Sequence, residues 1–257
     1  MMRGIAWALG LLCVNMLYGL ETSPVRERIS DVGAKSVSFP AKHFKIGQSG
    51  IILTHKEGYN VIIANARITQ IKDGVAYAEY APFDSIEQKY LPTPTATPVQ
   101  GDEVLFGGFY NKAIAIAPDQ TSYNQILSYN ENLPPQEQTH FMHIDVFAAF
   151  LAKDGINDPK PKHFKDFCST YSIGLIYVFA SNGINVLDCQ SFALLEEIAL
   201  PKPSLEHTNS PFFSRIANIN TGSLASKLRS KKSRQYFSYY DNLLSPYLQA
   251  FHLKTKE

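Results

Sequence analysis

The sequence predicts an α+β fold. An antiparallel β meander, closing a small barrel or a curled sheet, precedes a mixed half of helices and β-hairpins that ends in an amphipathic helix. Strand-like runs joined by short turns fill the first half of the chain. In the second half, apolar residues recur at helical spacing on both sides of another hairpin signal. We therefore expect the meander over residues 36–118 and the mixed half over residues 119–257.

Residues 1–19 have the layout of a secretory signal peptide. Arg3 supplies a positive charge, an uncharged apolar run extends from Gly4 to Tyr18, and the small residue Gly19 precedes a polar stretch. A membrane anchor is the alternative, but spanning a bilayer takes about 20 consecutive apolar residues and this run is shorter. We expect export with cleavage after Gly19, which leaves residues 20–257 as the mature chain.

Cysteine usage agrees with export. Cys13 lies in the predicted leader and follows Leu12, whereas a lipidated cysteine normally follows a small residue. Cleavage leaves Cys168 and Cys189, and two thiols in an oxidising compartment most often pair. Closing a loop of this length contributes about 3 kcal/mol on the chain-entropy model. Two buried free thiols are the alternative.

Composition places the chain among folded proteins and argues against some partners. It has 257 residues, of which 45% are hydrophobic, 18% charged and 12% aromatic. That length is enough for one large domain or two small ones. The formal net charge of +1 provides no global field to attract nucleic acid or an acidic membrane. Nucleic acid is therefore not an expected partner.

The meander is predicted from five strand-like runs, which are Ser49–His55, Tyr59–Ile71, Val75–Tyr80, Glu103–Tyr110 and Ala113–Ala117. Asp73-Gly74 is the clearest turn signal, because it supplies the two positive-φ positions of a tight primed turn. Lys56-Glu57-Gly58 and Asn111-Lys112 are further turns between neighbouring runs. Consecutive strands joined by such short turns pair antiparallel.

The proline-rich segment 91–98 interrupts the meander. It cannot be a central strand, because each proline fixes φ and removes a backbone donor. We expect an extended surface connection. A polyproline segment that recognises another protein is the alternative, but no charged anchor beside the prolines makes it specific.

Two helices and a hairpin are predicted next. Pro118-Asp119 opens the first helix. The second helix has a stronger apolar stripe, made by Phe141, Ile144, Phe147, Ala148 and Leu151. Asn182-Gly183 then separates the strand-like runs Ser172–Ala180 and Ile184–Asp188, and Phe192–Leu200 follows as a further strand.

The C-terminal amphipathic helix is predicted from apolar residues at helical spacing, which are Tyr236, Phe237, Tyr240, Leu243, Leu244, Tyr247, Leu248 and Phe251. Pro246 predicts a kink or a restart within it. We expect this helix to pack on the core. A helix lying on a membrane is the alternative, because the basic stretch Lys227–Arg234 precedes the aromatic residues, and membrane association stays open.

The sequence shows no catalytic constellation. It contains no nucleophile elbow, phosphate loop or dinucleotide fingerprint. His140 and His143 could share a helix face near Asp145, but a zinc site needs a third ligand in a recognisable place. Glu196 and Glu197 are adjacent and face opposite sides of a strand, so they cannot share a proton. We expect no enzyme activity, no metal and no cofactor.

The one dense charge feature is a basic cluster made by Lys227, Arg229, Lys231, Lys232 and Arg234. A solvated loop or helix face is one interpretation. The other is a surface that docks an acidic protein.

Several strings in the chain resemble the N-terminal domain of the bacterial plasminogen-binding protein PgbA family. They are KYLPTP from Lys89, GDEVLF from Gly101, IAPD from Ile116, Cys168, YSIGLIY from Tyr171, NVLDC from Asn185, Ser191-Phe192, SPFFSR from Ser210 and YFSYYD from Tyr236. In order, they cover most of the mature chain.

The resemblance implies an exported protein of a Gram-negative bacterium, at the cell surface, on the outer membrane or in the periplasm, that captures host plasminogen. Plasminogen's kringle modules hold a lysine ammonium in a cleft with anionic residues and aromatic walls. The candidate binding residues are the exposed lysines Lys227, Lys231, Lys232, Lys254 and Lys256. The alternative is a structural or assembly module of the envelope with no host ligand. An exported enzyme has no supporting residues.

Overall fold

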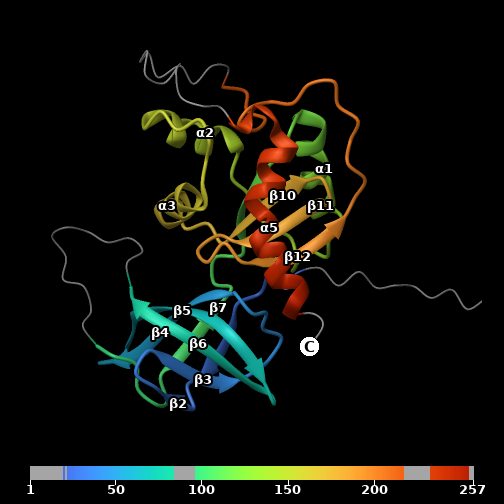
Figure 1. Ribbon diagram of the computed structural model, residues 1–257. Helices are drawn as coiled ribbons and strands as arrows, with labels where there is room; N and C mark the ends of the chain where they lie inside the picture. The colour runs from blue at the N-terminus through green and yellow to red at the C-terminus, as the bar shows by residue number, and fades with distance from the viewer. Residues whose placement is uncertain (1–19, 21, 84–95, 217–231, 255–257) are drawn as a thin grey trace, which may run out of the picture.

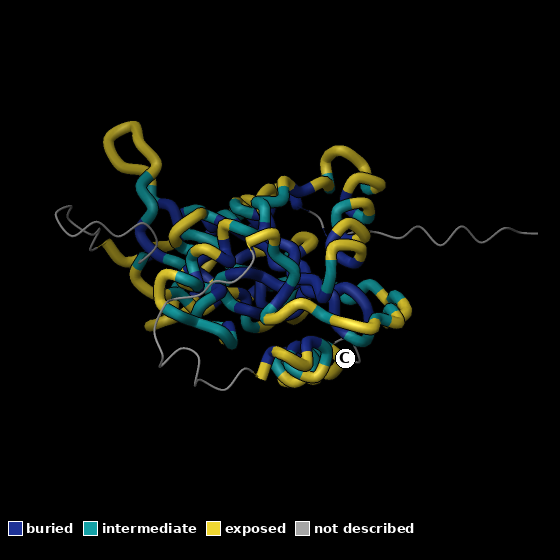
Figure 2. Tube along the Cα trace, turned by 90° about the horizontal axis from the view of Figure 1, so that it is seen from above, coloured by how far each residue is buried: buried dark blue, intermediate teal, exposed yellow. Residues whose placement is uncertain are grey.

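The computed structural model describes residues 20, 22–83, 96–216 and 232–254, and these fold into two packed halves (Figure 1). The predicted signal peptide and most of the proline-rich segment lie outside the described residues. Buried residues run through the interior of both halves, and exposed stretches mark the turns and the outer faces of helices (Figure 2). The α+β class predicted from the sequence is confirmed.

The first half is an antiparallel sheet of seven strands. They are β1 (Val25–Arg28), β2 (Asp31–Val32), β3 (Ser36–Pro40), β4 (Ser49–Lys56), β5 (Tyr59–Lys72), β6 (Val75–Pro82) and β7 (Glu103–Phe106). Their order across the sheet is β1-β7-β4-β5-β6-β3-β2, so β4, β5 and β6 form a meander of consecutive strands.

One short segment, residues 25–32, pairs with both edges of this sheet. Its first part is β1 beside β7, and its last part is β2 beside β3. In between, the Ile29 amide donates to the Asp102 carbonyl at 2.8 Å and the Ser30 amide donates to the Ser38 carbonyl at 2.8 Å. The sheet therefore curls into a half-barrel, called the barrel below, with this segment along both of its edges; the sequence predicts a small barrel or a curled sheet.

Three phenylalanines form the centre of the barrel core. Phe39 and Phe106 are fully or almost fully buried, and their rings stack with centroids 5.4 Å apart. The Phe44 ring meets both edge-on, at 5.4 Å and 5.3 Å. Strand β3 places Phe39 inside because its residues alternate between exposed and buried positions. This inward set gives the barrel a hydrophobic core separate from that of the second half.

Asp73-Gly74 forms the tip of the β5–β6 hairpin, as predicted. Both residues have positive φ, +51° and +74°, between paired Lys72 and Val75. The second hairpin differs from its prediction by one residue. Its turn is Ser181-Asn182, and Gly183 is already the first residue of its strand, paired with Ala180.

The second half combines a five-stranded mixed sheet with helices. Its elements are β8 (Lys112–Ile116), α1 (Gln120–Glu131), β9 (His140–Phe141), α2 (Ile144–Lys153), α3 (Pro161–Tyr171), β10 (Leu175–Ala180), β11 (Gly183–Asp188), β12 (Leu194–Ala199), the 3₁₀ turn η1 (Lys232–Arg234) and α5 (Tyr236–Lys254). The sheet order is β12-β11-β10-β8-β9.

Strand β8 corrects the predicted extent of the meander. The sequence predicts Ala113–Ala117 as part of the antiparallel meander, but β8 pairs parallel to β10 and β9 in the second sheet. The physical reason is burial on both faces. Four of its five residues are buried, and such continuous apolar strands are typical of parallel sheets covered by helices.

The helices agree with their sequence signals, with one exception. Asp119 caps α1 as predicted, because its carboxylate accepts a hydrogen bond from the Ser122 amide at 2.9 Å. The predicted second stripe becomes α2, although Phe141 lies before it in β9. Helix α3, which buries Phe164 and Phe167, is not predicted.

Helix α5 continues through Pro246 and packs on the second sheet (Figure 1). Tyr236, Tyr240 and Leu244 recur every four residues and are almost completely buried. The apolar stripe is therefore covered by the core of this half. Among the described residues, no helix is long and apolar enough to cross a membrane.

Cys168 on α3 and Cys189 after β11 are joined by a disulfide, with Cα atoms 6.0 Å apart. Both are fully buried. We expect the exported protein, denatured without reductant, to show no reactive thiol from this pair in a thiol titration. Prior reduction should release two thiols per chain. Two thiols without reduction would contradict the pairing.

Candidate functional site

The candidate binding lysines lie at two places on the chain. Lys232 is exposed and opens η1, and Lys254 is the last residue of α5. Lys227, Lys231 and Lys256 lie outside the described residues. The structure does show what holds the chain on either side of the segment 217–231, and both anchors are aspartates.

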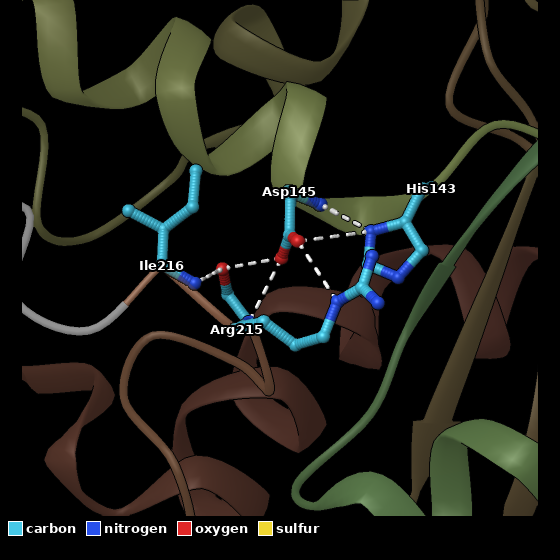
Figure 3. Close-up of polar contacts among 5 residues, drawn as sticks. His143, Asp145, Arg215 and Ile216 are labelled. Atoms are coloured by element: carbon cyan, nitrogen blue, oxygen red, sulfur yellow. Dashed lines mark hydrogen bonds and ion pairs between the residues drawn. The ribbon is translucent and has the colours of Figure 1, made fainter.

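The first anchor is Asp145, in the first turn of α2 (Figure 3). Its Oδ1 accepts hydrogen bonds from Ser214 Oγ at 2.9 Å and from the Arg215 amide at 2.8 Å. Arg215 Nε reaches Oδ2 at 3.1 Å, and the Ile216 amide donates to Ser214 Oγ at 3.1 Å. The carboxylate also lies at a helix N-terminus, where negative charge is favoured. Residues 214–216 are therefore fixed against α2.

His143 completes this cluster as the N-cap of α2. When neutral, its Nδ1 accepts a hydrogen bond from the Asp145 amide at 3.2 Å; when protonated, the same nitrogen pairs with Asp145 Oδ2, also 3.2 Å away. His140 is exposed in β9, so the two histidines do not share a helix face. In the described part of the chain, no group of three or more His, Cys, Asp or Glu side chains is arranged to hold a metal ion.

The Asp145 cluster predicts a pH-dependent contribution to stability. Burial raises the pKa of Asp145, but hydrogen bonds from Arg215 and Ser214 and the charge of His143 outweigh it, so the pKa lies below 3.8. A carboxylate with a lowered folded pKa stabilises the fold above its unfolded pKa, and this contribution is lost as the pH falls through the folded pKa.

We expect Asp145→Asn to lower the free energy of unfolding by about 1 kcal/mol at pH 7. The difference in unfolding free energy between the variant and the parent should narrow below pH 3.8, where the Asp145 carboxylate of the parent becomes protonated and therefore neutral. Urea unfolding at pH 7 and at a pH below 3.8 measures this difference. Asp166→Asn, at an exposed position on α3, is the control. A gap of the same size at both pH values would contradict the assignment.

The second anchor is Asp158, in the loop between α2 and α3. Its Oδ1 accepts from the Ser233 amide at 3.0 Å and its Oδ2 from the Lys232 amide at 3.2 Å. Ser233 Oγ donates to the Asn157 carbonyl at 3.0 Å and lies 3.1 Å from Ser210 Oγ. The backbone of Lys232 is therefore held in place while its side chain stays exposed.

Together, the two anchors place the ends of the segment 217–231 at opposite ends of one helix. Asp145 opens α2, and Asp158 follows its last residue, Lys153, by a short loop. A helix of ten residues is about 15 Å long. Residues 216 and 232, which flank the segment that contains Lys227 and Lys231, are thus held near the two ends of α2.

Lys254 lies at the other end of α5. Two residues earlier, His252 Nε2 lies 2.7 Å from Glu197 Oε2 on β12, which holds this end of the helix against the sheet. The next residue, Leu253, is 70% exposed. The helix therefore leaves the protein surface close to Lys254.

Comparison with known proteins gives the relatives of this chain. The family described as plasminogen-binding protein pgbA N-terminal matches residues 24–244. The chain belongs to this family. It is 34% identical over 241 residues to plasminogen-binding protein PgbA of Helicobacter pylori strain J99 / ATCC 700824, which covers 92% of this chain and 52% of that protein.

The same protein of Helicobacter pylori strain ATCC 700392 / 26695 is also 34% identical over 241 residues, covering 92% of this chain and 51% of that protein. The chain thus spans about half the length of the curated relatives it matches. No solved structure matches it. The family resemblance identified from the sequence strings is confirmed.

The PgbA N-terminal family match divides the candidate residues into two groups. Its range, 24–244, takes in both aspartate anchors and the basic cluster. It ends before Lys254 and Lys256. The charge density of the sequence indicates the basic cluster. Nothing in the sequence singles out Asp158, and Asp145 stands out only as a neighbour of two histidines. Their partners lie about 70 residues away in the chain, so no local spacing indicates them.

A cavity of about 590 Å³ lies between the barrel and the second half. Its walls include Ile51, Ile62 and Leu105 from the barrel, and Arg67 and Glu79 form an ion pair at 3.0 Å beside it. The described lining contains one carboxylate and neither histidine nor cysteine. It therefore brings together no nucleophile with a histidine base and no metal-ligand set.

Proposed function

We propose that this chain is an exported binding protein, not an enzyme, that captures plasminogen through exposed lysines. Membership of the PgbA N-terminal family carries the proposal, because the relatives are named as plasminogen-binding proteins. A protein that meets a plasma protein must leave the cell, which agrees with the predicted leader. We place it at the cell surface, on the outer membrane or in the periplasm.

The physical basis is the fit between lysine and a kringle cleft. A compact ammonium on a flexible stem enters a cleft with an anionic end and aromatic walls, whereas the broader guanidinium of arginine fits it less well. Lys232 offers such an ammonium to a partner, because its side chain is exposed while Asp158 holds its backbone. Each single contact is weak, so capture depends on several lysines engaging several kringles at once.

The test is retention of plasminogen by immobilised mature protein, with and without ε-aminocaproic acid as a lysine analogue. We expect the analogue to release plasminogen. A variant that combines Lys227→Gln, Lys231→Gln and Lys232→Gln with deletion of residues 252–257 should lose capture.

The matched control changes three exposed lysines on the barrel instead, Lys35→Gln, Lys56→Gln and Lys72→Gln. The control should bind like the parent, because its three substitutions leave all five candidate lysines in place. Equal binding by the cluster variant, or no competition by the analogue, would contradict the lysine mechanism. No retention by the parent would favour the alternative, a structural or assembly module of the envelope.

A further inference from the structure

Leu20, the first residue after the predicted leader, is buried against the second half. This side chain is 3% exposed and belongs to the hydrophobic core of the second half. Its backbone nitrogen donates a hydrogen bond to Glu196 Oε2 at 3.0 Å. Two residues later, Thr22 is also buried, and its Oγ1 donates to the Gln136 carbonyl at 3.0 Å. Leu20 therefore occupies a defined site against β12.

The carboxylate at this site is short of positive charge. Burial raises the pKa of Glu196, and the charge of Glu137 raises it further, while Lys45 and the Leu20 amide act in the opposite direction. The Lys45 ammonium donates a hydrogen bond to the Leu195 carbonyl, at 3.1 Å, and acts on Glu196 through its charge. A peptide amide brings only a dipole to Glu196, whereas an ammonium in the same position would bring a full charge.

The sequence provides a way to place an ammonium there. Gly19 is the small residue at the end of the predicted leader, so the bond to Leu20 is the expected cleavage point. Hydrolysis adds one water across this bond. The Gly19 carbonyl carbon becomes a carboxylate, and the Leu20 nitrogen becomes an α-amine that is protonated at neutral pH.

We propose that Glu196 is the binding site for the α-ammonium of Leu20, created when the Gly19–Leu20 bond is hydrolysed. The inference goes beyond plasminogen capture and does not depend on it. Removal of the leader then adds a full positive charge in hydrogen-bond contact with Glu196, where the unprocessed chain has the Leu20 amide and the charge of Lys45.

The pair predicts how stability depends on pH. An α-amino group has a pKa of about 7.7–8.0 when exposed, and the Glu196 carboxylate raises it in the folded state. The stabilisation is then present between the pKa of the Glu196 carboxyl and pH 7.7, and it is lost as the pH rises through the raised pKa of the amine. The other titratable groups facing Glu196 are Lys45, Glu137, Tyr129 and Tyr177. Burial raises the pKa of Tyr129 to about 12 and also raises that of Tyr177, so neither changes charge near neutral pH.

The experiment compares two mature chains released from a cleavable N-terminal fusion, one starting at Leu20 and one at Gly19. The extra glycine keeps the Leu20 amide, so it preserves the hydrogen bond and only moves the charge away by about one residue length, 3.8 Å. At pH 6 we expect the Gly19 chain to have a Tm about 2–4 °C lower. The difference should fade as the pH rises above the raised pKa of the amine.

Glu196→Gln supplies the cross-check. In this background the two chain starts should have equal Tm, whereas Glu197→Gln, the neighbouring substitution on β12, should leave the difference intact. The intact mass of the exported native protein should correspond to a start at Leu20. A different start, equal Tm values at pH 6, or a difference that persists in Glu196→Gln would each overturn the proposal.

Discussion

Asp188→Ala is expected to lower the free energy of unfolding by about 3–5 kcal/mol, because it removes a buried carboxylate that accepts five hydrogen bonds. Asp188 ends β11 and is completely buried. Its Oδ2 accepts from the Ser49 amide at 2.8 Å, from Ser49 Oγ at 2.7 Å and from the Tyr110 hydroxyl at 2.7 Å. Its Oδ1 accepts from the Gln190 and Ser191 amides at 3.0 Å and 2.7 Å. Each donor left unpaired costs about 1–3 kcal/mol.

Urea unfolding monitored by circular dichroism measures this loss. Asp188→Asn should recover part of it, because a carboxamide keeps the shape and one acceptor oxygen but turns an NH₂ group toward one set of donors. Asp31→Ala, at an exposed position on β2, is the control and should change stability by less than about 0.5 kcal/mol. A value this small for Asp188→Ala would show that the buried carboxylate is dispensable.

The same residue explains why the two halves meet in one arrangement. Ser49 belongs to β4 of the barrel, whereas Asp188 belongs to the second sheet. Next to this bond, Ser191 Oγ donates to the Gly47 carbonyl at 2.6 Å. Burial, followed by the Asp188 charge, raises the pKa of Tyr110 well above its usual 10, so its hydroxyl remains a donor. Asp188 therefore accepts two of the hydrogen bonds that join the halves, both from Ser49.

Features set by neighbouring residues are the ones that the sequence predicts well. The Asp73-Gly74 turn and the Asp119 cap each depend on a few consecutive residues, and both are confirmed. The Asn182-Gly183 signal is displaced by one residue, because Gly183 is required by the facing strand and not by the turn itself.

Features set by distant partners are the ones that the sequence misses. Nothing in the run Ala113–Ala117 indicates that its partner is β10, about 60 residues away, and not the preceding strand. Helix α3 is not predicted, although Phe164, Phe167 and Tyr171 recur at helical spacing and Pro161 at its first turn is a start signal. The anchors Asp145 and Asp158 are missed for the same reason as β8, since their partners are remote in the chain.

Gly183→Ala is expected to destabilise the protein by about 3–5 kcal/mol, through two effects that act together. Gly183 has φ of +124°, a conformation that residues with a side chain rarely adopt. It also lies opposite Ala199, and a Cβ atom would collide with the Ile198 carbonyl oxygen and the Leu200 nitrogen of the facing strand. The pairing of β11 with β12 would have to shift.

Two other glycines separate these effects. Gly101 has φ of +93° with open space around its Cα, so Gly101→Ala tests backbone strain alone and should cost about 1–2 kcal/mol. At Gly174 the φ angle is ordinary, but a Cβ would collide with the Phe109 backbone, so Gly174→Ala tests close approach alone, at about 1–3 kcal/mol. Chemical denaturation of the three variants should place Gly183→Ala near the sum of the other two. A loss no larger than that of Gly101→Ala would mean that β12 yields to the added methyl group, and the close strand approach would then not explain the glycine.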